Sequence, residues 1–70
     1  GIKAFGERLR HLRKEKGFSQ EELAFAADLE LSQISRIERG VINTSISQVF
    51  QIAEALGVPA ASLFDFEIQE

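Results

Sequence analysis

Hydrophobic residues near the start of the chain recur at the spacing of a helix, with Phe5, Leu9 and Leu12 on one side. Basic residues lie between them, so the outer side of this segment is positively charged. Gly17 then interrupts the pattern, as glycine commonly does after the last turn of a helix. The pattern predicts an amphipathic helix that reaches about Lys16 and turns a basic face to solvent.

Two capping boxes mark the start of two more helices. In this motif a Ser and a Glu or Gln three residues later each accept a hydrogen bond from the other's backbone amide. The sequence contains it at Ser19–Glu22 and at Ser45–Gln48. The apolar residues that follow each box predict helices that end near Ala27 and Leu56.

The two remaining helices are shorter. One is predicted over Leu31–Arg39 and is closed by Gly40; another runs from Pro59 to about Phe64, because proline suits a first helical turn. The connections are short, and the chain contains no internal repeat or low-complexity segment. The sequence therefore predicts an all-α fold, with five helices in one compact domain over residues 1–70.

The second and third predicted helices together form a helix-turn-helix motif over residues 19–39, with a turn at residues 28–30. At about 100° per residue, Ile34 and Ile37 face the core. The opposite side then carries small hydroxyl and arginine side chains, namely Ser32, Ser35, Arg36 and Arg39. Such a stripe suits a DNA major groove, where small side chains allow close approach and arginine pairs with guanine. An ordinary solvated helix face is the alternative.

Glu38 lies near the core side of the same helix, where an unpaired carboxylate is costly. We expect it to pair with Arg13, on the flank of the first helix. That pair would lock the first helix onto the third and hold Arg13 near the DNA backbone. The alternative is that Glu38 extends to solvent.

At three stretches the sequence resembles the Cro and phage-repressor type of helix-turn-helix regulators, also called the xenobiotic-response-element family. The stretches are LRHLRKEKGFSQEELA at 9–24, ISRIERG at 34–40 and IAEALGV at 52–58. Each is a weak signal alone, but their order and spacing are specific, and the resemblance extends roughly over residues 9–64. It implies a lambda-repressor-like DNA-binding domain of five helices whose recognition helix is Leu31–Arg39.

The resemblance also implies roles for individual residues. Gln20 matches a residue that holds a phosphate and sometimes touches a base, and Gln33 falls at the edge of the base-reading surface or on the DNA backbone. Arg13 and Glu38 match the buried ion pair of the family. The loop 40–45, which contains Asn43, matches a segment whose main-chain amides meet phosphate. The base-facing positions of the family correspond to Leu31, Ser32, Ser35 and Arg36.

Some residues depart from the family pattern. Asp28 stands where glycine is usual, although Asp tolerates a left-handed backbone better than most residues. Glu30 replaces a small capping residue, so the recognition helix starts with a weaker cap and a carboxylate near the phosphates. The loop 41–44 lacks Lys and Arg. We therefore expect modest affinity per monomer and a strong salt dependence carried by Arg10, Arg13 and Arg36, with Lys14 or Arg8 as a further contributor.

Composition and charge exclude several other classes of protein. The 70 residues carry a net charge of −3, but residues 1–16 hold six basic and two acidic side chains, which polarises the chain. The sequence has no Cys, one isolated His and no recognisable metal, cofactor or small-molecule motif, so we expect no enzyme and no cofactor. No apolar run is long enough to span a membrane, and we expect a cytoplasmic protein.

The acidic C-terminal half suggests contact between proteins. One recognition helix reads only a few base pairs, so we expect a homodimer on a palindromic operator. The fourth and fifth helices and the C-terminal tail, with Phe50, Phe66 and Ile68, would form the interface. The bland alternative is that these aromatic residues cover the edge of the core. The runner-up function is a helix-turn-helix fold used mainly for protein contact, as in an antitoxin or co-regulator.

Overall fold

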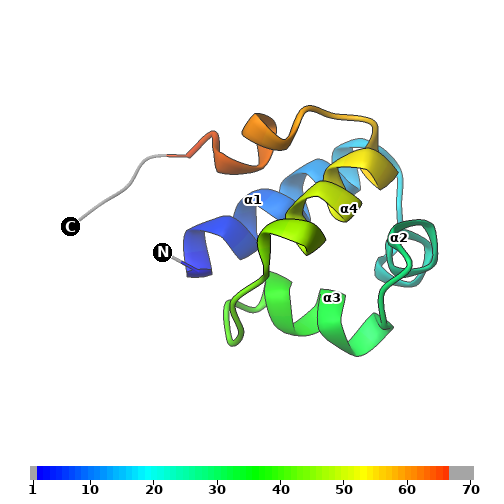
Figure 1. Cartoon of the computed structure of the whole chain (residues 1–70), viewed down its shortest axis with the longest axis horizontal. Coiled ribbons are helices and arrows are strands. Elements are labelled where there is room, and N and C mark those ends of the chain that lie inside the picture. The colour runs from blue at the N-terminus through cyan, green and yellow to red at the C-terminus, as the bar shows by residue number, and fades with distance from the viewer. Residues whose placement is uncertain (1, 67–70) are drawn as a thin grey trace.

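The computed structural model describes residues 2–66 as four α-helices followed by one 3-10 helix (Figure 1). Within these residues no helix is both long and apolar enough to cross a membrane. The helices are α1 (Ile2–Glu15), α2 (Gln20–Ala27), α3 (Leu31–Glu38), α4 (Ile46–Leu56) and the 3-10 helix η1 (Ala60–Phe64).

The predicted count of five helices is supported only in part, because the structure has four α-helices and the fifth predicted helix, η1, is a tighter 3-10 helix. The Ser62 amide donates to the carbonyl of Pro59 at 2.9 Å, which is a bond to the third residue back. Five residues after a proline are too few to complete α-helical turns, so the tighter bonding pattern prevails. The recognition helix is also one residue shorter than predicted, since it ends at Glu38 and Arg39 is its C-cap.

Both predicted capping boxes are present at the helix starts. Ser19 Oγ accepts from the Glu22 amide at 3.0 Å, and Glu22 Oε1 accepts from the Ser19 amide at 2.8 Å. Ser45 and Gln48 exchange the same two bonds, each at 3.2 Å. These reciprocal bonds satisfy amides that a helix start otherwise leaves unpaired, which fixes where α2 and α4 begin.

The turn between α2 and α3 depends on Asp28, which has a left-handed backbone with φ of 59°. The Leu29 amide donates back to the Ala24 carbonyl at 2.9 Å, which closes the last turn of α2. Aspartate occupies this backbone region more readily than most non-glycine residues. The substitution for glycine noted in the sequence is therefore compatible with the tight turn.

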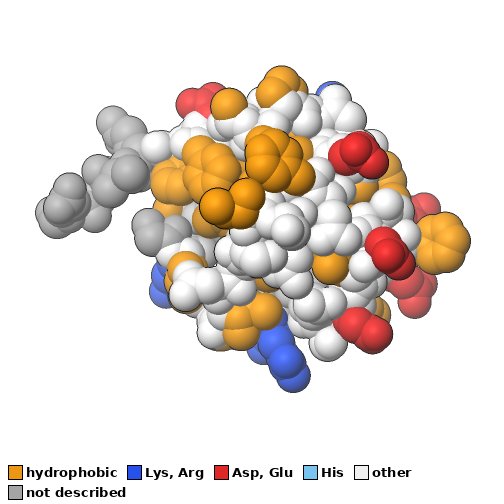
Figure 2. All heavy atoms as spheres, in the orientation of Figure 1, with side chains coloured by type: hydrophobic (Ala, Val, Ile, Leu, Met, Phe, Trp, Pro, Cys, Tyr) orange, Lys and Arg blue, Asp and Glu red, His pale blue; other side chains and the backbone are white. Residues whose placement is uncertain are grey.

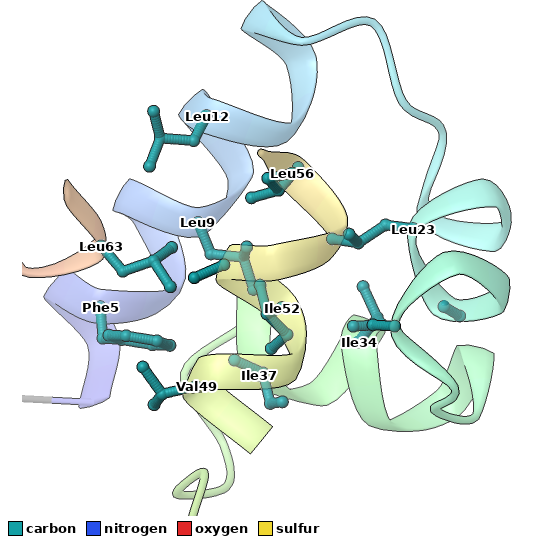
Figure 3. Packing of buried hydrophobic residues seen from close by; sticks show 13 residues of the cluster. Phe5, Leu9, Leu12, Leu23, Ile34, Ile37, Val49, Ile52, Leu56 and Leu63 are labelled. Atoms are coloured by element: carbon teal, nitrogen blue, oxygen red, sulfur yellow. The ribbon is translucent and has the colours of Figure 1, made fainter. Parts of the chain in front are cut away.

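The core lies between α4 and the other elements, and Figure 3 shows apolar side chains from all five meeting there. Helix α2 packs against α4 and α3, while η1 packs against α1 and α4. The six largest fully buried side chains are Leu9, Leu23, Ile34, Ile37, Ile52 and Leu63. Two of these residues, Ile34 and Ile37, belong to α3. Because they are buried, they fix which side of α3 faces the core and which side faces solvent.

Helix α1 approaches the end of α3 closely at Gly6. A Cβ added at Gly6 would lie 2.3 Å from the Ile37 carbonyl oxygen and 2.8 Å from that of Glu38. Both atoms belong to the backbone, so they cannot move aside as a flexible side chain could. Glycine is therefore required for the contact that places α1 against the recognition helix, a feature that the sequence analysis missed.

Candidate nucleic-acid interface

The outward face of α3 carries the stripe that the helical angle predicts. Ile34 and Ile37 are buried, whereas Ser32 and Arg36 are exposed and Ser35 is half-buried. Leu31 at the start of the helix is 45% exposed, which is high for a leucine next to a packed core. The face therefore combines small hydroxyls, an apolar tip and a free guanidinium, the groups that read base edges in a major groove.

The first turn of α3 is closed by its own residues. Gln33 Oε1 accepts from the Glu30 amide at 3.0 Å, and Gln33 is half-buried. This bond satisfies the amide of the N-cap residue, as the third helical residue does in a capping box, whereas Glu30 makes no side-chain cap bond of the kind that Ser or Thr gives. The side-chain oxygen of Gln33, a residue predicted at the edge of the base-reading surface, is therefore already used in a bond within the first turn of α3.

A buried ion pair joins α1 to the last turn of α3. Arg13 Nε donates to Glu38 Oε2 at 2.6 Å, and Arg13 Nη2 donates to Glu38 Oε1 at 3.1 Å. Arg13 and Glu38 are each 7% exposed. A two-pronged bond of this kind has a fixed geometry, so it sets the position of the recognition helix relative to α1.

The burial of Arg13 changes its expected relation to DNA. Its remaining nitrogen, Nη1, donates to the Phe18 carbonyl at 2.8 Å. All three guanidinium nitrogens thus bond within the protein, and the side chain has little surface to offer a phosphate. In this geometry Arg13 positions its neighbours, whereas the sequence predicts that the ion pair holds Arg13 near the DNA backbone.

Gln20 adds a third member to the ion pair. Its Nε2 donates to Glu38 Oε1 at 3.0 Å, so the first residue of α2 is tied to the last residue of α3. The amide nitrogen has a second hydrogen that this bond leaves free. The family resemblance implies a phosphate contact for Gln20 but gives no sign of this bond, because no local spacing relates residues 18 apart in the chain.

These groups surround a polar hollow of about 370 Å³ between α1, α2 and α3. Its lining residues are Arg10, Arg13, Gln20, Ser35, Glu38 and Arg39. The ion pair neutralises Arg13 and Glu38, and Arg10 and Arg39 are exposed. Arg39 Nε also donates to the Ser35 carbonyl at 3.3 Å. The hollow is thus suited to an anionic group such as a phosphate.

Not every basic residue of α1 faces this hollow. Arg8 Nε donates to the Ser62 carbonyl at 2.8 Å, and Arg8 Nη2 lies 3.8 Å from Asp65. Arg8 therefore holds η1 in place and is turned away from α3. Among residues 2–66, no group of three or more His, Cys, Asp or Glu side chains could hold a metal ion.

The loop after α3 offers donors of another kind. Gly40 and Val41 donate their amides back to α3, and the Ser45 amide donates to Gln48. The amides at 42–44, including that of exposed Asn43, have no acceptor within the described part of the chain. Neighbouring free amides are a common way to hold a phosphate without a positive charge.

A different surface lies over α4 and η1, where hydrophobic side chains gather (Figure 2). Ile46 is 77% exposed, Phe50 61% and Phe64 53%. In the whole stretch 41–64 only Glu54 is charged. We call the surface of Ile46, Phe50 and Phe64 the apolar face. Its composition is unlike that of α2, near which Figure 2 shows mainly acidic side chains.

Comparison with known proteins assigns the chain to a family. The helix-turn-helix family matches residues 9–63. The control protein C.BamHI of Bacillus amyloliquefaciens is 46% identical over 63 residues, which cover 89% of this chain and 78% of that protein. The immunity repressor of Bacillus phage phi105 is 36% identical over 58 residues, or 83% of this chain and 40% of the repressor.

A solved structure agrees with this assignment. The restriction-modification controller protein C.AhdI from Aeromonas hydrophila superposes with a TM-score of 0.89 at 43% identity, covering 90% of this chain and 96% of that one. Its architecture and the order of its helices thus match those described above. The chain belongs to the helix-turn-helix family of transcription regulators, of the Cro and phage-repressor type.

Proposed function

We propose that the protein binds a specific double-stranded DNA operator and regulates transcription from it, with residues 31–39 in the major groove. The observation that carries this proposal is the outward stripe of Ser32, Ser35 and Arg36 on a helix whose orientation is fixed by the buried Arg13–Glu38 pair. Leu31 supplies an apolar contact for a thymine methyl group, and Arg36 a bidentate contact for guanine.

The proposal includes contacts to the DNA backbone. Arg10 and Arg39 flank the polar hollow and supply charge, and Gln20 offers its free amide hydrogen to a phosphate. The loop amides around Asn43 meet a second phosphate at the other end of α3. Gln33 contacts the DNA backbone at the edge of the base-reading surface. Arg13 orients Gln20 through Glu38, so it contributes to DNA binding only indirectly.

We assign the apolar face to a homodimer, through α4, η1 and the tail. Two identical chains of net charge −3 repel each other, and an uncharged face is where they approach at the least electrostatic cost. The exposed fractions of Ile46, Phe50 and Phe64 support this assignment. Residues 67–70, with Ile68 of the predicted interface, lie outside the described residues.

The named relatives, a control protein, an immunity repressor and a restriction-modification controller, support a regulator of the controller or repressor kind. We propose that it works on a palindromic operator in the cytoplasm. A two-fold dimer presents two recognition helices, so it reads two half-sites about one helical turn apart. A role mainly in protein contact, as in an antitoxin, is less favoured because the conspicuous polar surface surrounds α3.

Selection of binding sites from random duplex DNA tests this function directly. We expect a two-fold symmetric site and an affinity that falls steeply with salt concentration. No enrichment at low salt would overturn the proposal and direct the search to protein partners. A monomeric protein on an unsymmetric site would overturn the dimer alone.

A further inference from the structure

An apolar groove of about 360 Å³ adjoins the apolar face. Buried Phe5 and Val49 line it together with exposed Ile46 and Phe64. The rings of Phe5 and Phe64 lie 5.2 Å apart at 46°, so one side of the groove is built from paired aromatic side chains. A groove lined in this way is open to a large apolar side chain.

One wall of the groove is the loop that follows the recognition helix. Ile42, Asn43 and Thr44 all line it, and these are the loop residues described above, whose amides have no acceptor within residues 2–66. Their remaining ties are few: Ile42 packs against the core, and Thr44 Oγ1 donates to Gln48 Oε1 at 3.0 Å. The segment that offers donors to a phosphate is therefore also a boundary of the apolar groove.

A second copy of the chain is the occupant that the surface favours. The groove shares Ile46 and Phe64 with the apolar face, so the two form a continuous surface. A two-fold contact sets a surface against itself, which requires a face without excess charge of one sign. Residues 41–64 meet this requirement, since Glu54 is their single charged residue.

We infer that a second copy inserts an apolar side chain into this groove and thereby fixes the loop 42–44 in the conformation that meets phosphate. The inference rests on the proposed function and adds a coupling between its two parts. Each protomer of a dimer then binds its half-site more tightly than a free monomer does, before any gain from having two half-sites. By linkage, DNA strengthens the dimer by the same factor.

The test compares a dimer with a monomer on a duplex that holds one half-site. Phe50→Glu places a charge on the apolar face at an exposed position, so the fold is retained while association is opposed. We expect the wild-type protomer to bind the half-site about three- to tenfold more tightly than the variant, since an added phosphate hydrogen bond has about this effect. In the absence of DNA, exchange of the amides at 42–44 is slower in the dimer.

Phe25→Glu is the matched control. Phe25 is 90% exposed and lies on α2, away from the apolar face, so this variant adds the same charge and remains a dimer. Because α2 is part of the DNA-binding motif, the charge of Phe25→Glu should oppose DNA at least as strongly as that of Phe50→Glu. Weaker half-site binding by Phe50→Glu than by Phe25→Glu is therefore not explained by the added charge. Circular dichroism establishes that both variants are folded.

A double-mutant cycle identifies the loop as the carrier of the coupling. Asn43→Pro removes one of the free loop amides, so it should weaken half-site binding by the dimer and have a smaller effect in the Phe50→Glu background. Asn43→Ala keeps the amide and is the control for this change. Equal effects in the two backgrounds, or equal half-site affinities of monomer and wild-type protomer, would overturn the coupling and leave the proposed function intact. A Phe50→Glu variant that stays dimeric would overturn the interface, and no DNA binding by the wild type would overturn the function.

Discussion

The two halves of this small domain are held together in different ways. Residues 1–40 contain all eight basic residues, and α1 is joined there to α3 by a buried ion pair. Residues 41–64 carry one charge, and α4 and η1 pack through Val49, Ile52 and Leu63. The first half fixes polar groups in space for an anionic partner, whereas the second leaves apolar surface for a like copy. The comparison separates the helix face proposed to read bases from the face proposed to meet a second copy, and the loop 42–44 borders both.

The largest effect should come from breaking the ion pair that holds the first half. Glu38→Ala leaves Arg13 buried without its partner, and loss of one member of a buried pair costs about 3–5 kcal/mol. Urea unfolding at neutral pH measures this as a lowered midpoint. In a 70-residue domain that loss is a large part of the total stability.

The double variant Arg13→Met, Glu38→Leu is the control for this prediction. Replacing both charges with apolar side chains removes the unpaired group, so most of the lost stability should return. The DNA affinity of the double variant should be lower than that of the wild type, because Gln20 loses the Glu38 carboxylate that orients its side chain. A single variant as stable as the wild type would show that the pair is not what holds α1 to α3.

The next effect concerns recognition of the DNA sequence, for which we have proposed only residues of the first half. Arg36→Ala should weaken operator binding by about 1–3 kcal/mol and relax specificity at one base pair, because it removes a guanine contact. Titrations against operators changed at each position measure both. Arg10→Ala is the matched control: it should weaken binding to all sequences alike and reduce the salt slope by about one. The same pattern from both variants would contradict the assignment of Arg36 to a base.

A comparable loss of stability is expected at the closest approach of two helices. Gly6→Ala would bring a Cβ to 2.3 Å from the Ile37 carbonyl oxygen, and such overpacking costs about 1–3 kcal/mol. Helix propensity alone would predict a gain of about 1 kcal/mol from the same change, so the sign of the shift in thermal midpoint is decisive. A stabilised variant would mean that α1 and α3 separate without penalty.

Local signals explain what the sequence predicted well. The capping boxes, the glycine ends and the alternation of Ile34 and Ile37 with Ser35 and Arg36 depend on residues within four positions of each other, and they set the helices and the face of α3. Features that depend on distance in space escaped. The Gln20–Glu38 bond and the turn of Arg8 toward Ser62 join residues 18 and 54 apart, and no spacing indicates them.

Two predictions do not follow this division between local and distant features: the Arg13–Glu38 pair, which is distant but was predicted, and η1, which is local but was predicted only in part. A carboxylate on the core side of a helix requires a partner, which is a physical demand that a sequence displays even when the partner is distant. The type of a five-residue helix is decided by a few bonds of similar strength, and the pattern of side chains does not distinguish them.

The smallest effect compares the two capping boxes, which differ in whether the third residue of the helix ionises. In α2 the Ser19 amide, and then the Ser19 hydroxyl, lower the pKa of the Glu22 carboxyl from its ordinary value of 4.5. A carboxyl with a lowered folded pKa gives stability that is fully present above the unfolded pKa and is lost as pH falls through the folded value. Glu22→Gln installs the neutral box found at Ser45–Gln48.

Thermal unfolding of both proteins between neutral pH and pH 3 should therefore show their midpoints converging as the pH falls. The difference is small, because Glu22 is fully exposed and water competes for both bonds. Ser19→Ala removes the hydroxyl from the box and should reduce the difference. A constant difference across this range would mean that the charge of Glu22 adds nothing to the cap. The two boxes would then be equivalent, and the contrast between the halves would rest on Arg13, Glu38 and the apolar face alone.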